Sequence, residues 1–247
     1  MLKDYNEIFQ FAELAAEKCL EYLQTSIIKV EVELNTRRDT KINIDKILND
    51  QIHLILNKTD IPILSEENKK KSFLNGLQWI IDPLDGSINY LRGLPVYAIS
   101  IALWDNYNPI HGIIVDITNG KIYKSSDANS RSFQISTSKL KESILATGIP
   151  SSVKKFDKHK IDQLGIFCNE FKKIRMLGSA SMSLYYVYKG VFDAYYEDGI
   201  YIWDVASGLC FINQTGGKFE IEIYDNLTCR VIASNKNIFH QFKKLLK

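Results

Sequence analysis

The stretch WIIDPLDGSINY, residues 79–90, leads an apolar run directly into two acids and a tight turn. The apolar residues 79–81 favour a buried strand that ends where Asp82 begins. Pro83 fixes its own φ and removes an N–H, so it holds Asp82 and Asp85 at a set spacing. Functional side chains collect at strand ends, because the loops there vary while the scaffold stays rigid. The stretch therefore predicts a rigid strand that presents two carboxylates at its end.

Two carboxylates so close together repel each other unless a cation lies between them. Oxygen ligands at a D-x-x-D spacing suit Mg²⁺, which leaves its other positions to water and phosphate. Gly86 and Ser87 then open a short helical turn whose free N–H groups would face an anion. Taken alone, the pattern is more often a turn with Asx hydrogen bonds, so both interpretations stay open at this point. An EF-hand is excluded, because Pro83 and Gly93 fall at its second and twelfth loop positions.

The composition is that of a soluble globular protein of 247 residues, 45% apolar and 24% charged, with a formal net charge of +2. Such a mixed charge gives no argument for nucleic acid or for a membrane surface. We find neither a secretory signal nor a run long enough to span a bilayer. The four cysteines are far apart and form no CxxC pair, which predicts buried thiols in a reduced, cytoplasmic setting.

Apolar periodicity predicts helices over 4–24 and 43–57, with the polar segment ELNTRRDTK, residues 33–41, as an exposed loop between them. From residue 77, short apolar runs broken by Gly, Asn and Pro predict a sheet of neighbouring strands. After about residue 140 the pattern alternates between strands and helices, as in an α/β layer. The later helices are expected over 158–171, 180–189, 203–214 and 236–246.

Acids and small residues recur where the chain turns. Glu66 and Glu67 follow the apolar stretch IPIL, and Asp204 opens a helix after an aromatic run. An Asp at a helix start is usually only an N-cap. Small residues also separate a later strand from its helix: Gly178, Ser179 and Ala180. They would let N–H groups approach an anion, or they would simply form a tight packed turn.

Taken together, these segments resemble the inositol monophosphatase family of metal-dependent, lithium-sensitive phosphatases. The matching segments, in the family's order and spacing, are SEEN (65–68), WIIDPLDGSINY (79–90), LGSAS (177–181), DAYYEDGIYIWDVASG (193–208) and TGG (215–217). They cover most of the chain, and the pair D-P-x-D-G-[ST]-x-N and W-D-x-A-x-G is highly specific.

The resemblance implies a layered α-β-α-β-α sandwich of the inositol monophosphatase/fructose-1,6-bisphosphatase type. Residues 1–138 would form an α+β half that carries most metal ligands. Residues 139–247 would form an α/β half that completes the site, within one compact functional unit. The resemblance also implies a homodimer, while the mixed charge predicts neither a membrane nor a nucleic acid as partner.

The implied chemistry is hydrolysis of a phosphate monoester by water activated at two Mg²⁺ ions, or three. The implied metal ligands are Glu66, Asp82, the carbonyl of Leu84, Asp85 and Asp204. The implied catalytic group consists of Asp45 and Ser87, which would orient the water, and Glu67, which would support the ligands. The implied substrate and phosphate contacts are Gly86, Ser87, Gly178, Ser179, Ala180 and Glu197.

One position departs from the family pattern. The family carries D-x-x-T-x-x-D before its second helix, whereas DTKINID, residues 39–45, keeps Asp39 and Asp45 but has Ile42 in place of Thr. The departure bears on the ordering of metal or water beside this segment, and on the number of metal ions.

Glu197 matches the position at which inositol-type enzymes place a carboxylate against substrate hydroxyls. The tripeptide Ile202-Trp203-Asp204 differs from the E-W-D of the nucleotidase branch. Inositol monophosphate is therefore the first substrate expected. Fructose-1,6-bisphosphatase, histidinol-phosphatase and 3′(2′),5′-bisphosphate nucleotidase activities stay open. A hypothesis of another class is a non-catalytic protein partner in the RNA or transcription machinery, which the near-neutral charge does not favour.

Overall fold

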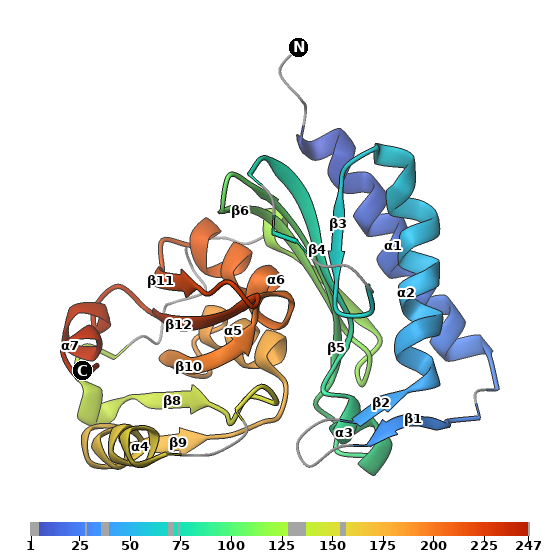
Figure 1. Ribbon diagram of the computed structural model, residues 1–247. Coiled ribbons are helices and arrows are strands. Elements are labelled where there is room, and N and C mark those ends of the chain that lie inside the picture. The colour runs from blue at the N-terminus through green and yellow to red at the C-terminus, as the bar shows by residue number, and fades with distance from the viewer. Residues whose placement is uncertain are drawn as a thin grey trace.

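The computed structural model describes residues 5–27, 29–35, 40–68, 72–73, 75–127, 137–153 and 157–246. These residues stack in five layers, which are a helix pair, a sheet, a second helix pair, a second sheet and an outer helix layer (Figure 1). Each layer buries an apolar face against the next, as layered domains must. The predicted α-β-α-β-α sandwich is therefore confirmed.

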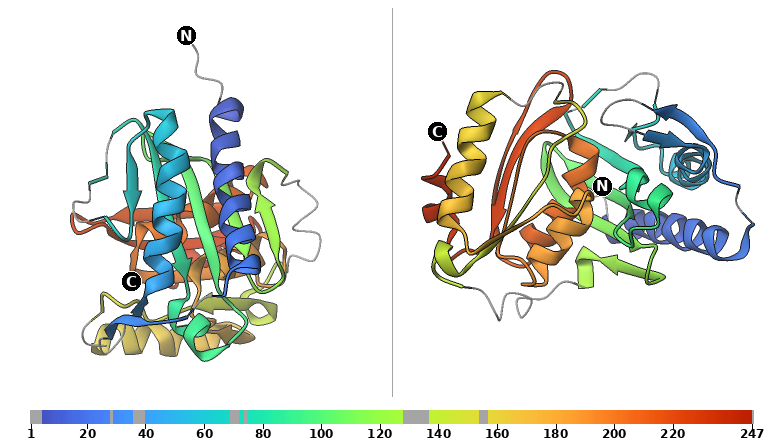
Figure 2. Two further views of the ribbon diagram at one scale, coloured as in Figure 1. Left: turned by 90° about the vertical axis from the view of Figure 1, so that its right-hand side faces the viewer. Right: turned by 90° about the horizontal axis from the view of Figure 1, so that it is seen from below.

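The first sheet has the strand order β3-β4-β5-β6-β7, and of these pairs only β3 and β4 run parallel. Its strands are β3 (Ile63–Ser65), β4 (Leu77–Asp85), β5 (Ala98–Asp105), β6 (Asn108–Asp116) and β7 (Lys121–Lys124). Helices α1 (Tyr5–Thr25) and α2 (Asn43–Leu56) lie side by side on its outer face (Figure 2). Their apolar rows pack on Trp79 and Ile81 of β4, close to where the periodicity predicts both helices.

Helices α5 (Ala180–Tyr188) and α6 (Ile202–Gln214) lie between the two sheets. Helix α6 is buried over residues 205–212, as expected for a helix that is covered on both sides. It approaches β6 so closely that a Cβ added to Gly112 would lie 2.6 Å from the carbonyl oxygen of Ser207. This contact fixes the start of α6 against the first sheet.

The second sheet has the order β11-β12-β10-β8-β9. Its strands are β8 (Ile144–Thr147), β9 (Lys173–Arg175), β10 (Ala194–Tyr201), β11 (Lys218–Ile223) and β12 (Thr228–Ser234). Strand β8 runs parallel to β9 and β10, whereas β12 runs antiparallel to β10 and β11. Helices α4 (Lys158–Glu170) and α7 (Phe239–Lys243) cover its outer face through aromatic contacts such as that between Phe167 and Phe242.

The segment predicted as an exposed loop over 33–41 instead contributes to a two-stranded hairpin. Strand β1 (Val32–Asn35) pairs antiparallel with β2 (Thr40–Ile42), and β2 leads directly into α2. Val32 and Leu34 of β1 alternate with Glu33 and Asn35, as in a strand, but the prediction merged this short run with the polar residues that follow it. The remaining short elements are α3 (Ser87–Arg92) and 3₁₀ turns at Asn57–Thr59, Ser125–Asp127 and Leu140–Glu142.

Three smaller predictions were wrong. Strand β11 was missed. Its sequence KFEIEI directly follows the end of a helix, and its apolar side chains are only partly buried. Helix α7 is shorter than the predicted 236–246. The thiol of Cys168 is exposed, although the other three cysteines are buried and all four are free.

Each sheet draws its strands from one side of residue 139 only. The division into functional halves at that residue stays a prediction. No helix in the described ranges is long and apolar enough to cross a membrane.

The close contact between β6 and α6 can be tested with two glycine substitutions. Gly112→Ala should lower the free energy of unfolding by about 1–3 kcal/mol, because the new methyl group would overlap Ser207. Gly165→Ala, at an exposed position in α4 with open space around it, should raise it by about 0.5–1 kcal/mol. Urea unfolding measures both, and equal effects at the two positions would refute the packing argument.

Candidate functional site

The two acids of WIIDPLDGSINY belong to the last part of β4, rather than to a turn beyond it. Asp82 pairs with Ser100 and Asp85 with Ala98, so β4 has one more residue than β5 between these pairs. The extra residue is a β-bulge. Because Ala98 and Ser100 lie on the same face of β5, the bulge puts both acids on the face toward α5 and α6. In a regular strand, residues 82 and 85 would point to opposite faces of the sheet.

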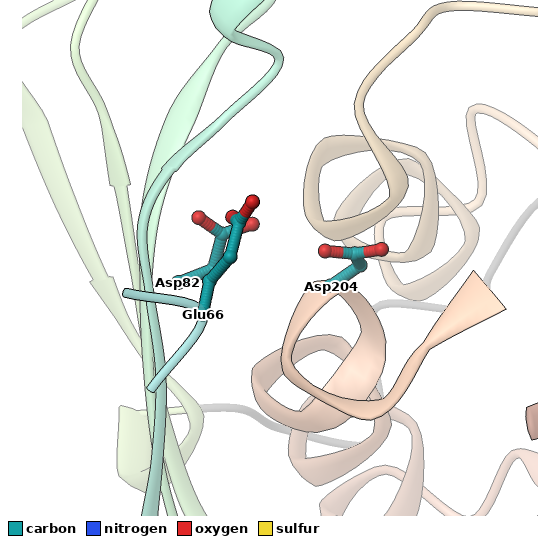
Figure 3. A group of neighbouring side chains, drawn as sticks. All are labelled: Glu66, Asp82 and Asp204. Carbon is teal, nitrogen blue, oxygen red and sulfur yellow. The ribbon is translucent and has the colours of Figure 1, made fainter. Parts of the chain in front are cut away.

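Three carboxylates from separate elements converge on this face. Glu66 follows β3, Asp82 lies in β4, and Asp204 lies in the first turn of α6. One oxygen of each lies within 4.8 Å of the other two. Figure 3 shows Asp204 facing the other two acids across the space between the sheets. The parallel pairing of β3 and β4 explains why Glu66 and Asp82 meet at one sheet edge.

The electrostatics of this cluster fit a cation. Burial raises the pKa of Asp82 well above its ordinary value, and the charges of Glu66 and Asp204 raise it further. Burial likewise raises the pKa of Asp204, with Asp85 and Glu66 adding to the effect. Buried carboxylates that raise one another's pKa either stay protonated or share a positive charge. The hard oxygen atoms of this cluster could hold Mg²⁺ or a similar divalent ion.

Asp85 points to the start of α5. Its carboxylate accepts hydrogen bonds from the Ser179 hydroxyl (2.6 Å), the Ser181 amide (2.8 Å) and the Ser181 hydroxyl. The Ala180 amide lies 3.4 Å from its other oxygen. Burial raises the pKa of Asp85, whereas these hydrogen bonds oppose the rise. Asp85 therefore lies beside the group of three carboxylates, and its assignment as a metal ligand stays a prediction.

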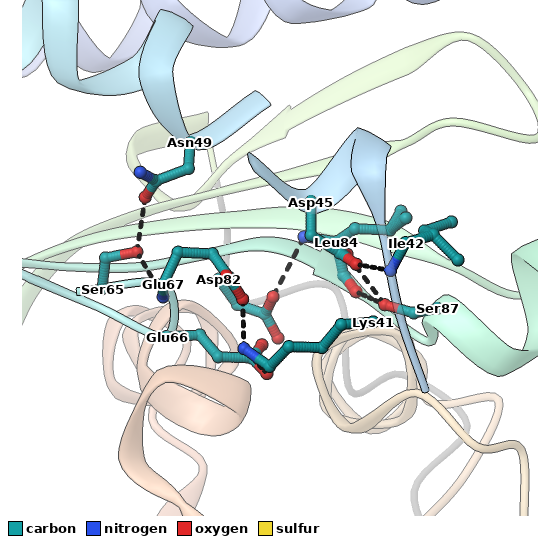
Figure 4. A network of polar contacts seen from close by, with 10 residues as sticks. All are labelled: Lys41, Ile42, Asp45, Asn49, Ser65, Glu66, Glu67, Asp82, Leu84 and Ser87. Carbon is teal, nitrogen blue, oxygen red and sulfur yellow. Dashed lines mark hydrogen bonds and ion pairs between the residues drawn. The ribbon is translucent and has the colours of Figure 1, made fainter. Parts of the chain in front are cut away.

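Asp45 and Ser87, predicted as a pair, are in contact. The Ser87 hydroxyl lies 2.9 Å from Asp45 Oδ1 and 2.9 Å from the carbonyl oxygen of Leu84 (Figure 4). The Ile42 amide donates to Asp45 Oδ2 at 2.6 Å, while the Ile42 side chain is buried in the core. Burial raises the pKa of Asp45 to about 7, and the charge of Glu66 adds to the effect. Asp39 lies outside the described residues.

Glu67 forms an ion pair with Lys41 of β2, a residue that the sequence analysis did not single out. The Glu67 amide donates to the Ser65 hydroxyl at 3.2 Å, and that hydroxyl donates to Asn49 of α2 at 2.7 Å (Figure 4). These two hydrogen bonds join the end of β3 to α2. Glu67 thus lies outside the three-carboxylate group, consistent with the supporting position predicted for it.

Gly86 and Gly178 stand where two loops approach each other. Gly86 has a φ of 90°, and a Cβ there would lie 3.3 Å from the carbonyl oxygen of Gly178. The side-chain amide of Asn89 donates to the carbonyl oxygens of Val96 (2.8 Å) and Leu177 (2.7 Å). These contacts explain both glycines by close backbone approach. The sequence analysis did not single out Asn89, although it is the last residue of the D-P-x-D-G-[ST]-x-N pattern.

Glu197 of β10 lies against Gly148, where a Cβ would come within 2.5 Å of Glu197 Oε1. Its side chain is buried, and burial raises its pKa to about 8. The charge of Asp85 adds to that shift. A glycine at 148 is therefore the residue that leaves room for this carboxyl group.

A single cavity of about 260 Å³ joins most of these groups. It is lined by the predicted residues Glu66, Asp82, Leu84, Asp85, Gly86, Ser87, Gly178, Ser179, Ala180, Glu197 and Asp204. Among the predicted residues, Asp45 and Glu67 lie behind its wall. Lining residues that were not predicted include Thr40, Thr147 and Trp203. A volume of this size admits a small molecule better than a polymer.

Comparison with known proteins supports this picture. The sequence model of the inositol monophosphatase family matches residues 4–244. A fructose-1,6-bisphosphatase/inositol-1-monophosphatase of Aquifex aeolicus is 27% identical, over 98% of this chain and 94% of that protein. The Nus factor SuhB of Xylella fastidiosa is 31% identical, over 76% of this chain and 73% of that protein. The solved inositol monophosphatase of Anabaena superposes with a TM-score of 0.80 at 25% identity, over 99% and 96% of the two chains.

The raised pKa values predict how the metal-free protein responds to pH. Asp45, with a pKa of about 7, and Glu197, with a pKa of about 8, hold protons in the folded chain that the unfolded chain releases near pH 4. The folded state therefore binds more protons across this range, and the free energy of unfolding should fall as pH rises from about 5 to 8.

Thermal unfolding in EDTA at several pH values measures this slope. Glu197→Gln should make it shallower, because one of the two groups is removed. A melting temperature that rises steadily from pH 5 to pH 8 would contradict the assignment.

Proposed function

Because the chain belongs to the inositol monophosphatase family, and is therefore a phosphoric monoester hydrolase, we propose that it hydrolyses a small polyol phosphate. Inositol monophosphate is the first substrate we infer. The observation that carries the proposal is the cavity in which Glu66, Asp82 and Asp204 converge while Glu197 lines the same space. The three clustered acids would hold the metal ions that bind the phosphate, and the carboxyl group of Glu197 would bind hydroxyl groups. Together they suit a phosphate ester of a sugar alcohol.

The family is metal-dependent, and the carboxylate cluster fits Mg²⁺. Glu66, Asp82 and Asp204 would hold the ions, and Asp85 and the carbonyl of Leu84 would complete the set. When bound, Mg²⁺ neutralises the charge of the phosphoryl oxygens and lowers the pKa of water. The proposal includes two such ions, or three.

Asp45 is the group we assign to proton transfer. A carboxylate within hydrogen-bonding reach of the group that orients a water can act as its general base. The Ile42 amide and the Ser87 hydroxyl hold its two oxygens in place. Since Ser87 lines the cavity and Asp45 lies behind it, Ser87 would orient the attacking water and Asp45 would take its proton.

The phosphate would bind beside the carboxylates, at the loops that follow β4 and precede α5. The amides of Gly86 and Ser87 open α3 at the cavity wall, and Gly178, Ser179 and Ala180 line the same wall. The positive φ of Gly86 turns the backbone into this wall without a side chain in the way. Neutral donors of this kind hold a phosphate without adding a like charge to the acidic cluster.

Other phosphomonoesters stay within the proposal. Fructose-1,6-bisphosphate is favoured by the Aquifex relative, whose name includes that activity. Histidinol phosphate and 3′(2′),5′-bisphosphate nucleotides are further alternatives. The Nus factor name of the Xylella relative favours a second function, that of a protein partner in the transcription machinery. A cytoplasmic homodimer that lithium inhibits is the form that family membership favours.

Asp82→Asn tests the proposed hydrolysis. Wild-type protein should release phosphate from inositol 1-phosphate only when Mg²⁺ is present, and the variant should lose about 100-fold or more of kcat/KM. That factor corresponds to about 3 kcal/mol of lost transition-state stabilisation. Asp116→Asn, which alters a buried acid outside the cavity, is the matched control and should keep near wild-type activity. A wild-type rate no higher than that of Asp82→Asn would refute the enzymatic proposal and favour the protein-partner function.

Glu197→Gln tests the choice of a polyol substrate. The variant keeps the shape of the side chain but replaces one carboxyl oxygen with an NH₂ group, which cannot accept a hydrogen bond, so kcat/KM for inositol 1-phosphate should fall about 10-fold. The value for p-nitrophenyl phosphate, which has no hydroxyl groups, should change less than about 2-fold. Glu222→Gln, at an exposed ion pair with Arg230, serves as control. Equal losses for the two substrates would argue against recognition of hydroxyl groups by Glu197.

A further inference from the structure

A lysine reaches into the acidic group from the hairpin that precedes α2. The ammonium of Lys41 lies 3.3 Å from Glu66 Oε1 and forms a hydrogen-bonded ion pair with Glu67. The side chains of Lys41 and Glu66 are each 25% exposed, and that of Glu67 is 18% exposed. Figure 4 shows the Lys41 side chain extending alongside Glu66 and toward Glu67. This is a partly buried contact, so solvent screens it less than a surface pair.

The backbone of β2 fixes the direction of this lysine. Lys41 pairs with Leu34 across the hairpin, and its neighbours Thr40 and Ile42 are both buried. Successive side chains of a strand point to opposite sides, so the burial of Thr40 and Ile42 directs Lys41 away from them. The next turn of chain carries Asp45, whose carboxylate binds the Ile42 amide. Lys41 is thus held by the same segment that holds a proposed catalytic acid.

The charge of Lys41 is well supported. A lysine side chain keeps its proton up to about pH 10 in water, and Lys41 lies against the carboxylates of Glu66 and Glu67, which favour the charged ammonium. The ammonium is therefore a permanent positive charge beside Glu66, which is one of the three clustered carboxylates. A lysine ammonium is a compact point charge on a flexible stem, and it can oppose a carboxylate as a small cation does.

We propose that the ammonium of Lys41 takes the place of one divalent cation at the metal site. It neutralises charge on Glu66 and thereby reduces by one the number of divalent ions that the site binds tightly. The inference rests on the proposed function, because it takes Glu66, Asp82 and Asp204 as the metal-binding group. It also decides between the two numbers of Mg²⁺ ions that family membership leaves open, in favour of two. Lys41 acts through its charge on a proposed ligand and does not contact the substrate.

The proposal predicts that removal of the charge strengthens metal binding. Lys41→Met and Lys41→Gln keep a side chain of similar length without the ammonium, and Lys41→Arg keeps the charge. The probe is Mn²⁺, with free ion followed by electron paramagnetic resonance during titration of the full chain at fixed ionic strength. Lys41→Met and Lys41→Gln should bind one more Mn²⁺ than wild type, or bind the weakest ion about 10-fold more tightly. Lys41→Arg should match wild type.

A matched control shows whether losing any partly buried ion pair has the same effect on metal binding as losing the pair between Lys41 and Glu66. Lys124 pairs with Glu13 at 3.2 Å, with both side chains 32% exposed, away from the cavity. Lys124→Met should therefore leave Mn²⁺ binding unchanged. If Lys41 had only a structural function, Lys41→Met and Lys124→Met would change the melting temperature alike. Neither variant would then alter the number or affinity of bound ions.

Two results would overturn the role of Lys41 alone. One is unchanged Mn²⁺ binding in Lys41→Met and Lys41→Gln. The other is weaker binding in both variants, since the lysine would then be needed to hold Glu66 in place for the metal. A wild-type chain that binds no Mn²⁺ at all would instead overturn the proposed metal-dependent function, and this inference with it.

Discussion

Repulsion among carboxylates in a buried cavity constrains the rest of this structure. Glu66, Asp82 and Asp204 come within 4.8 Å of one another, and each ionised acid disfavours ionisation of the others. Neighbouring hydrogen-bond donors and one ammonium group offset part of this negative charge. Serine hydroxyls and amides at the start of α5 bind Asp85, and the ammonium of Lys41 lies against Glu66. The clustered oxygens of the three acids form a compact group suited to divalent cations.

The five layers serve this group by bringing its members from both sheets to one place. The parallel ends of β3 and β4 supply two carboxylates, and α6, packed between the sheets, supplies the third. The bulge in β4 then turns Asp82 and Asp85 to the same side. The close approach of α6 to Gly112 sets how near Asp204 comes to the first sheet. Burial of α6 thus contributes to the core and to the site through the same contacts.

Sequence patterns predicted the features that repeat or that match a motif. The period of apolar residues in α1 and α2 indicated both helices, and the D-P-x-D-G-[ST]-x-N pattern indicated the cavity residues. Strand β1 escaped although its residues alternate between apolar and polar, because the run is only four residues long and leads into a polar segment. Lys41 escaped for another reason. Its partners lie more than twenty residues away in sequence, and no spacing rule links a strand lysine to a distant acid.

Asn89 shows that a motif can include residues that shape a site without reacting. Its amide joins the turn after β4 to the loop before α5 through two neutral hydrogen bonds. Neutral bonds between buried groups respond little to ionic strength, whereas the carboxylate side of the cavity responds strongly to ions. The loops on the glycine side of the cavity are therefore joined by neutral hydrogen bonds, whereas the acidic side carries the groups that respond to ions. Changes in salt would act on one wall and leave the shape of the other unaltered.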